Sequence, residues 1–273
     1  MADSTCSAEQ IDAVMRALQA SRRYRTIDAG VLRRLAADAL YASDGRLNPA
    51  IKHAKGQLHQ AFGAYWGAPP QYGRLLSELR GAAESGPVAL RACLRRVMAA
   101  HASSRERLPI LDQFYGEVFA RIGRPRSIID LACGLNPLAA PWMDYERAGV
   151  YYALDIDANL IQFLREALTL LQIEHQAMLW DAVAGPPHVQ AKAALLLKTL
   201  PCLEQQRPGS GLALLKALDS PIVVVSFPSR SLGGRQKGMR ETYARWFEAE
   251  AGQEGWGRER LDFAAELVYI VRK

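Results

Sequence analysis

The sequence predicts an α/β protein in which an N-terminal bundle of helices precedes a doubly wound, mostly parallel sheet. Two observations support this fold class. From residue 127 onward, short apolar runs of strand length alternate with longer segments of helical period, which is typical of a parallel sheet covered by helices. Before residue 108 the apolar residues recur only at helix spacing, as do Ile11, Val14, Met15 and Leu18.

Turn signals separate the N-terminal helices. Asp28 is a candidate N-cap for the second helix, which contains Val31 and Leu40. We expect Leu47-Asn-Pro49 to break the chain before a third helix over residues 51–65. Further helices are expected over residues 75–82, 88–100 and 108–122.

The strands are expected where apolar runs are short and bounded by polar or turn residues. These runs are residues 128–131, 150–154, 175–179, 193–197 and 222–227, with a terminal hairpin of 261–264 and 267–272. Helices over 160–171, 212–218 and 241–251 and a polar, glycine-rich loop over 228–238 complete the pattern.

The composition favours one large domain or two small ones with a proper core, since 49% of the 273 residues are hydrophobic. The sequence has no apolar run of about eighteen residues and no secretory pattern at its N-terminus. We therefore expect a soluble, cytoplasmic protein. Separately, we expect it to act as a monomer. The four cysteines lack metal-ligand spacing, which predicts reduced thiols and no metal.

The positive charge is concentrated in the first part of the chain. The net charge is +6, yet residues 1–107 contain 16 Lys and Arg against 9 Asp and Glu, whereas residues 108–273 contain 18 against 19. This asymmetry favours a polyanion-binding module over residues 1–107 joined to a nearly neutral catalytic domain over residues 108–273. A solvated helical face would explain the charge equally well.

The stretch from Ser127 to Leu138 has the form of a nucleotide pocket. A buried strand ends near Asp130 and is broken at Cys133-Gly134, and a helix is expected to begin near Leu138. The glycine would let a ligand approach the backbone at the carboxyl end of the strand. The second and third glycines of a pyrophosphate site are missing, which argues against NAD and favours S-adenosylmethionine.

Carboxylates follow three of the expected strands. Asp155 is placed to accept hydrogen bonds from two ribose hydroxyls, and Asp181 to accept one from an adenine amino group. Taken together with Asp130, they favour a nucleoside site, although each alone would suit a loop cap or turn.

Two further residues allow alternative readings. Arg107 would clamp the carboxylate of the cofactor through a two-pronged ion pair, or else form a surface salt bridge with Glu106 or a neighbour. Cys133 suits close packing beside the glycine better than a role as a nucleophile, since no base is evident nearby.

Several motifs closely resemble the aminoglycoside-resistance 16S rRNA methyltransferases that modify guanine 1405 at N7. They are the segments Asp130 to Pro137, Lys198 to Glu204 and Ser226 to Arg235, together with His101 to Arg107 and Gly63 to Tyr65. The resemblance implies a Rossmann-like class I methyltransferase sheet behind a basic helical RNA-binding domain. It implies S-adenosyl-L-methionine as cofactor and 16S rRNA in the assembled 30S subunit as partner.

The resemblance also implies which residues form the site. Lys198 and Glu204 would act at the cofactor or target base. The expected cofactor-binding residues are Tyr65, His101, Ser103, Arg107, Ala132, Gly134, Asp155, Ile156, Asp181, Ala182, Leu197 and Gln206. The expected RNA-binding residues are Arg22, Arg23, Arg25, Lys52, Lys55, Arg95, Arg96, Arg230, Arg235, Lys237 and Met239.

Other functions remain open at this point. The chain would also suit a methyltransferase acting on another RNA site or on a small molecule, with the basic bundle serving as a lid. A noncatalytic RNA-binding protein with a vestigial cofactor fold is a third possibility. Guanine N7 carries a lone pair and no proton, so its methylation needs positioning rather than a general base, which suits a sequence without an evident acid–base pair.

Overall fold

The protein forms a single seven-stranded sheet flanked by helices, which confirms the expected α/β class. The computed structural model describes residues 7–146, 148–229 and 238–273. The strands are β1 (Ser127–Leu131), β2 (Val150–Asp155), β3 (His175–Leu179), β4 (Ala193–Leu197), β5 (Ile222–Pro228), β6 (Gly257–Asp262) and β7 (Glu266–Arg272).

The strand order is β3-β2-β1-β4-β5-β7-β6. Strands β1 to β5 are parallel, and β7 pairs antiparallel with both β5 and β6. The terminal hairpin is therefore confirmed, but its first strand is Gly257–Asp262 rather than residues 261–264. The chain builds the sheet in one direction from β1 to β3 and in the other direction from β4 onward, so the strand order reverses between β1 and β4. In sheets of this kind, ligands bind at the carboxyl ends of the strands beside the reversal.

Short 3-10 turns and α-helices connect the strands and build the N-terminal part. The α-helices are α1 (Ala8–Gln19), α2 (Ala29–Tyr41), α3 (Leu47–Ala61), α4 (Tyr72–Glu84), α5 (Pro87–Met98), α6 (Ala102–Arg107), α7 (Leu111–Ile122), α8 (Ala158–Leu170), α9 (Thr199–Gln206), α10 (Ser210–Ala217) and α11 (Met239–Gln253). The 3-10 turns are η1 (Gly63–Tyr65), η2 (Leu108–Ile110) and η3 (Asn136–Trp142). In the part of the chain that the structure describes, no helix is both long and apolar enough to cross a membrane.

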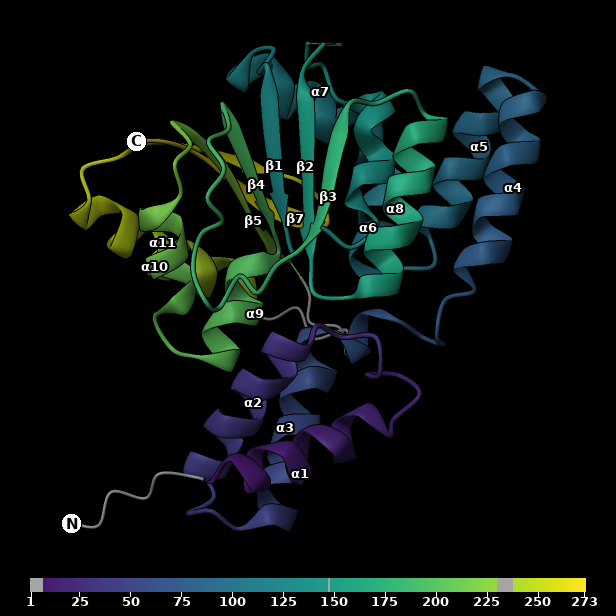
Figure 1. Ribbon diagram of the computed structural model, residues 1–273. Helices are drawn as coiled ribbons and strands as arrows, with labels where there is room; N and C mark the ends of the chain where they lie inside the picture. The colour runs from purple at the N-terminus through teal and green to yellow at the C-terminus, as the bar shows by residue number, and fades with distance from the viewer. Residues whose placement is uncertain (1–6, 147, 230–237) are drawn as a thin grey trace.

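The N-terminal helices do not form one bundle. Figure 1 shows α1, α2 and α3 as a separate group beyond the carboxyl ends of the strands, whereas α4 and α5 lie beside α8 at the edge of the sheet layer. In agreement, α4 packs on α8 and α5 on η3. The division of function at residue 107 stays a prediction.

Local chemistry explains where several elements differ from expectation. Asp28 caps α2 as expected, accepting from the N–H groups of Gly30 and Val31. The expected break at Leu47 to Pro49 is wrong: α3 begins at Leu47, because proline is tolerated in the first turn of a helix. The helix expected near Leu138 is the 3-10 turn η3, whose interior proline removes a backbone donor.

Each central strand is buried on both faces. Ile128 packs into the core with α7 and α8, whereas its neighbour Ile129 packs into the core with α10 and α11. Adjacent residues of a strand point to opposite faces, so a sheet covered on both sides needs uninterrupted apolar runs. This explains why the strands appear in the sequence as short continuous apolar segments.

A buried ion pair joins α6 to the first residue of β7. Arg107 Nε and Nη2 donate to the two carboxylate oxygens of Glu266 at 2.7 and 2.5 Å, and the side chains are 2% and 0% exposed. Ser226 on β5 also donates to Glu266, at 2.8 Å. Removing one partner of a buried pair leaves an uncompensated charge, so this contact is expected to support the fold strongly.

We predict that Glu266→Ala lowers the free energy of unfolding by about 3–5 kcal/mol, measured by urea denaturation. The matched control is Glu259→Ala, because Glu259 on β6 pairs with Arg121 while its side chain is 48% exposed. An exposed pair of this kind should contribute less than about 1 kcal/mol. Equal losses in the two variants would contradict a special role for the buried pair.

Candidate active site

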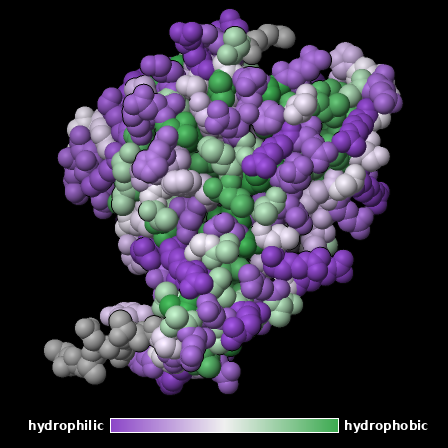
Figure 2. Space-filling model, viewed as in Figure 1, coloured by the Kyte–Doolittle hydropathy of each residue, from purple (hydrophilic) through white to green (hydrophobic). Residues whose placement is uncertain are grey.

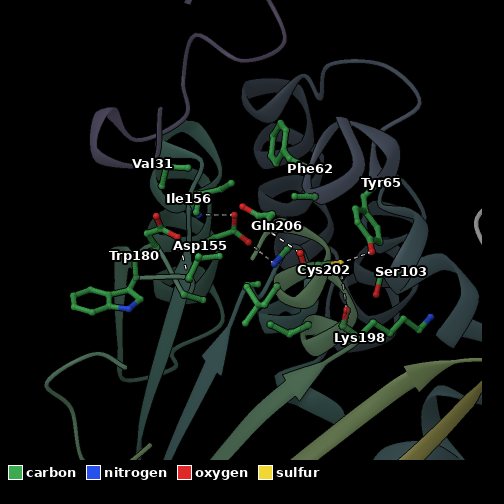
Figure 3. A pocket seen from close by; sticks show the side chains of 18 of the residues that line it. Val31, Phe62, Tyr65, Ser103, Asp155, Ile156, Trp180, Lys198, Cys202 and Gln206 are labelled. Carbon is green, nitrogen blue, oxygen red and sulfur yellow. Dashed lines mark hydrogen bonds between the residues drawn. The ribbon is translucent and has the colours of Figure 1, made fainter. Parts of the chain in front are cut away.

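A cavity lies at the carboxyl ends of β1, β2 and β4. The group of helices α1, α2 and α3, here called the bundle, closes it from the other side through Val31, Arg34 and Phe62. Figure 3 shows Trp180 and Asp155 toward one end of the cavity and Tyr65 and Lys198 toward the other. The two ends therefore offer different chemistry to one elongated ligand.

Asp155 is the last residue of β2 and is 8% exposed. Its carboxylate accepts from the N–H of Gly134 at 2.9 Å and from the N–H of Ile156 at 2.7 Å. A carboxylate has about four acceptor positions, so capacity for the hydroxyls of a ribose remains. Burial raises the pKa of Asp155 to about 6.

The turn after β1 brings the backbone close to His101. Gly134 has φ +51, and a Cβ there would lie 2.9 Å from Cε1 of His101. Ala132 also adopts a left-handed backbone, with φ +52, which costs about 1–2 kcal/mol for a residue with a Cβ. Only a glycine at position 134 thus lets the imidazole form the wall of the cavity.

His101 is suited to meet a polar group of a ligand. Its Nδ1 is buried without a hydrogen-bond partner among the described residues. Burial, with the nearby charges of Lys198 and Arg107, lowers the pKa of His101 to about 3, so the ring is neutral. Its ring also stacks on Tyr65, with the ring centroids 5.4 Å apart.

Asp181 connects the sheet to the bundle. Arg34 on α2 donates from Nε and Nη2 to its two oxygens at 2.5 and 3.1 Å, and both side chains are 13% exposed. Asp181 also accepts from the N–H of Val183 at 3.0 Å. A hydrogen bond from an adenine amino group to Asp181 stays a prediction. The sequence did not indicate that Arg34 would pair with this carboxylate.

Eleven of the twelve expected cofactor-binding residues line the cavity, and Arg107 is the exception. The alternative of a surface salt bridge with Glu106 or a neighbour is wrong, because Arg107 is buried and paired with Glu266. Arg107 Nη1 also donates to Asn136 at 2.8 Å. Three of its five N–H groups are thus engaged, and a contact with the cofactor stays a prediction.

Asp130 does not join the other strand-end carboxylates. It accepts from Asn136 at 2.8 Å and from Tyr151 at 2.7 Å inside the core, and it is not among the residues that line the cavity. Burial raises its pKa to about 7. The interpretation of three aspartates around one nucleoside is therefore wrong for Asp130.

Cys133 is buried, and burial raises the pKa of its thiol well above the ordinary value, which supports packing rather than nucleophilic attack.

The structure separates the two residues expected at the reaction centre. Lys198 lines the cavity, and its Nζ lies 2.6 Å from Glu106. The expectation for Glu204 is wrong, because its carboxylate accepts from the N–H groups of Gly209 and Gly211, at 2.6 and 2.9 Å, at the start of α10. Glu204 is a helix-capping residue on the side of α9 that faces α10 rather than the cavity.

The expected RNA-binding residues fall into several groups. Arg22, Arg23 and Arg25 line one recess with Trp66 and Tyr72. Lys52 and Lys55 are exposed on α3, and Met239 begins α11. In the view of Figure 2, hydrophilic residues flank the narrow waist between the bundle and the sheet. The expected residues outside the described part of the chain are Arg230, Arg235 and Lys237.

Ion pairs reduce the positive charge of α5. Arg95 pairs with Asp112 at 3.2 Å, and Arg96 pairs with Glu78 at 3.4 Å. Burial and pairing act in opposite directions on Asp112, and its pairing with Arg91 and Arg95 holds its pKa below the usual value. An RNA contact from Arg95 or Arg96 stays a prediction.

Sequence reasoning missed several residues of the cavity wall. Trp180 lies between the end of β3 and Asp181 and lines the cavity. An aromatic residue directly after a strand could have indicated this position. Arg34 and Phe62 come from the bundle, and no local pattern indicates that they reach the cavity. Cys202 lies on α9, a helix that was not expected as an element.

Comparison with known proteins identifies the family. The model of the ribosomal RNA methyltransferase family FmrO matches residues 20–270. This chain belongs to that family. A 16S rRNA (guanine(1405)-N(7))-methyltransferase of Micromonospora echinospora is 45% identical over 97% of each chain, and one of Frankia casuarinae is 46% identical over 98% of this chain and 95% of that one.

Solved structures agree with membership in the FmrO family. The crystal structure of the 16S rRNA methyltransferase RmtF in complex with S-adenosyl-L-homocysteine has a TM-score of 0.81 and 32% identity, covering 98% of this chain and 99% of that chain. The structure of the 16S rRNA methylase RmtB has a TM-score of 0.79 and 28% identity, over 96% and 98%. The sequence and the structure thus both place the chain among ribosomal RNA methyltransferases.

The cavity of this FmrO-family protein fits S-adenosylmethionine. Asp155 offers acceptors for ribose hydroxyls, and the buried Nδ1 of His101 lacks a partner among the described residues. Ile156, Ala182 and Leu197 supply apolar wall for an adenine ring and a thioether chain. Bound there, the cofactor supplies a methyl group activated by a sulfonium.

We predict that Gly134→Ala weakens cofactor binding at least tenfold, roughly the effect of 1.4 kcal/mol, because the new Cβ meets the buried His101 ring. Calorimetric titration with S-adenosylmethionine measures this. Gly116→Ala is the control, since a Cβ at this exposed position of α7 meets nothing within 4 Å. That variant should keep wild-type affinity and gain up to about 1 kcal/mol in stability.

The raised pKa of Asp155 gives a second prediction. The ionised carboxylate accepts from hydroxyls and the protonated one accepts less well, so affinity for S-adenosylmethionine should be constant above about pH 7. It should fall below the pKa of about 6, by up to about tenfold per pH unit. Asp155→Asn should remove this dependence, and a dependence that persists in this variant would contradict the assignment to Asp155.

Proposed function

We propose that this protein methylates N7 of guanine 1405 in the decoding site of 16S rRNA, within the assembled 30S subunit, and so protects the ribosome against aminoglycosides. Relatives carrying that name at 45% and 46% identity support this assignment. The observation that carries it is the junction of the cofactor cavity with a second cavity, because Tyr65, Lys198 and Cys202 line both. A base held in the second cavity would face the methyl group.

The proposed reaction requires little acid–base catalysis from the protein. Guanine N7 attacks with an in-plane lone pair and loses no proton, so the residues need only hold the base in line with the methyl group and exclude water. N7 faces the deep, narrow groove of A-form RNA, so the guanine must turn out of its stack to enter the second cavity. No general base is required of the neutral His101.

The basic residues of the bundle would hold the RNA. Arg22, Arg23 and Arg25 line one recess, and such a group of arginines suits the phosphates of an RNA backbone. Residues 1–107 would thus supply RNA binding and residues 108–273 the reaction, with one copy of the chain sufficient for both and no metal required.

The direct test is incubation of 30S subunits with labelled S-adenosylmethionine, followed by mapping of the modified nucleotide. Methylation at N7 of guanine 1405 is the expected result. Methylation at another nucleotide would redirect the assignment within RNA, and methylation of a small molecule without any effect of subunits would overturn it. Asp155→Ala should lose activity while keeping its affinity for subunits.

We predict a selective drug profile in a sensitive bacterium that expresses the protein. Methylated N7 carries a fixed positive charge and a new methyl group, so a polycationic drug against that edge meets repulsion and a steric clash. Inhibitory concentrations of gentamicin and kanamycin should rise, and those of streptomycin and apramycin should not. Resistance to apramycin with sensitivity to gentamicin would indicate a different nucleotide, and the Asp155→Ala variant should protect against none of the four.

A further inference from the structure

The second cavity has a polar wall next to the junction with the cofactor cavity. Lys198 lines both cavities, whereas Glu106 lines only the second one. Both charged residues therefore border the second cavity, and Lys198 also belongs to the wall that the two cavities share. Tyr243, whose ring stacks on Phe227 with centroids 5.1 Å apart, lines the same cavity.

Lys198 and Glu106 form a close ion pair in which each side chain can still make further hydrogen bonds. Lys198 Nζ donates to Glu106 at 2.6 Å, and the side chains are 4% and 33% exposed. An ammonium has three N–H donors and a carboxylate about four acceptor positions, so each retains free groups after this contact. The pair thus presents a donor and an acceptor side by side to whatever occupies the cavity.

Lys198 has an unusual backbone conformation. Lys198 has φ +60 and ψ +20, a left-handed conformation that residues with a Cβ rarely adopt. Its N–H donates to both the carbonyl and the hydroxyl of Ser226 at 3.0 Å, which holds this conformation. Strained backbone of this kind is maintained where it positions a functional side chain.

We infer that Lys198 and Glu106 select guanine by reading its edge. Along that edge guanine presents acceptors at N7 and O6 and then donors at N1 and N2. With N7 at the junction, Lys198 donates to O6 and Glu106 accepts from the N1–H and the N2 amino group. Adenine presents a donor where O6 would be and an acceptor at N1, so both contacts fail. This assignment rests on the proposed methylation of guanine.

The charges also suit the reaction. As the bond from N7 to the methyl carbon forms and the bond from sulfur breaks, the positive charge passes to the guanine ring, and no proton leaves. An unpaired Lys198 would oppose this charge, whereas Glu106 at 2.6 Å neutralises it. A carboxylate accepting from N1–H further stabilises the cationic ring.

The test uses the full-length protein and 30S subunits reconstituted with 16S rRNA transcripts that carry guanine or adenine at the target nucleotide. Glu106→Gln keeps the size of the side chain and removes the charge. We expect kcat/KM on guanine subunits to fall about 10- to 100-fold and the rate on adenine subunits to stay level or rise. The control Glu117→Gln alters an exposed carboxylate of α7 paired with Arg121 and should match the wild type.

Two companion measurements separate base reading from structural support. Affinity for S-adenosylmethionine and affinity for subunits should stay within about twofold of wild type in Glu106→Gln. Unchanged kcat/KM on guanine subunits, an equal loss on both substrates, or weakened cofactor binding would each overturn the inference. Failure of the wild type to methylate guanine subunits would instead overturn the proposed function.

Discussion

The buried contact between Arg107 and Glu266 holds together the segments on which the site depends. Glu266 also accepts from Ser226, which in turn accepts from the backbone N–H of Lys198, while Arg107 donates to Asn136. Burial would raise the pKa of Glu266, but Arg107 and Lys198 hold it below its ordinary value. Its contribution to stability is therefore present above the unfolded pKa and is lost only as the pH falls through the lower folded value.

The cavity is closed because the bundle attaches to both of its rims. On one side Asp28 donates from its N–H to the carbonyl of Ile156 at 2.9 Å. On the other side Gln57 on α3 donates from Nε2 to the carbonyl of Gln206 on α9 at 3.3 Å. The expected RNA-binding helices therefore form the roof over the cofactor, and the same contacts that dock the bundle shape the pocket. The helices that we propose to bind RNA are thus also the part of the chain that covers the cofactor cavity.

Local patterns predicted the sheet and the cofactor end of the site, because strand ends and the glycine after β1 leave signals within a few residues. Asp155 was found this way, whereas Asp130 lies one residue before the end of β1 and points into the core. A shift of one residue reverses the face of a strand, and patterns do not fix ends that closely. The partners of Arg34 and Glu204 depend on how helices dock, which no local pattern encodes.

The charges around the transfer end explain why the site needs no acid–base pair. S-adenosylmethionine is a sulfonium cation, and a protonated imidazole in the wall would repel it. Burial lowers the pKa of His101 to about 3 and keeps the ring neutral. Arg107 is compensated by Glu266, and Lys198 by Glu106. Arg107 and Lys198 thus each have their own carboxylate, so the positive charge can pass from sulfur to the base without repulsion from an unpaired charge on either residue, and catalysis reduces to positioning.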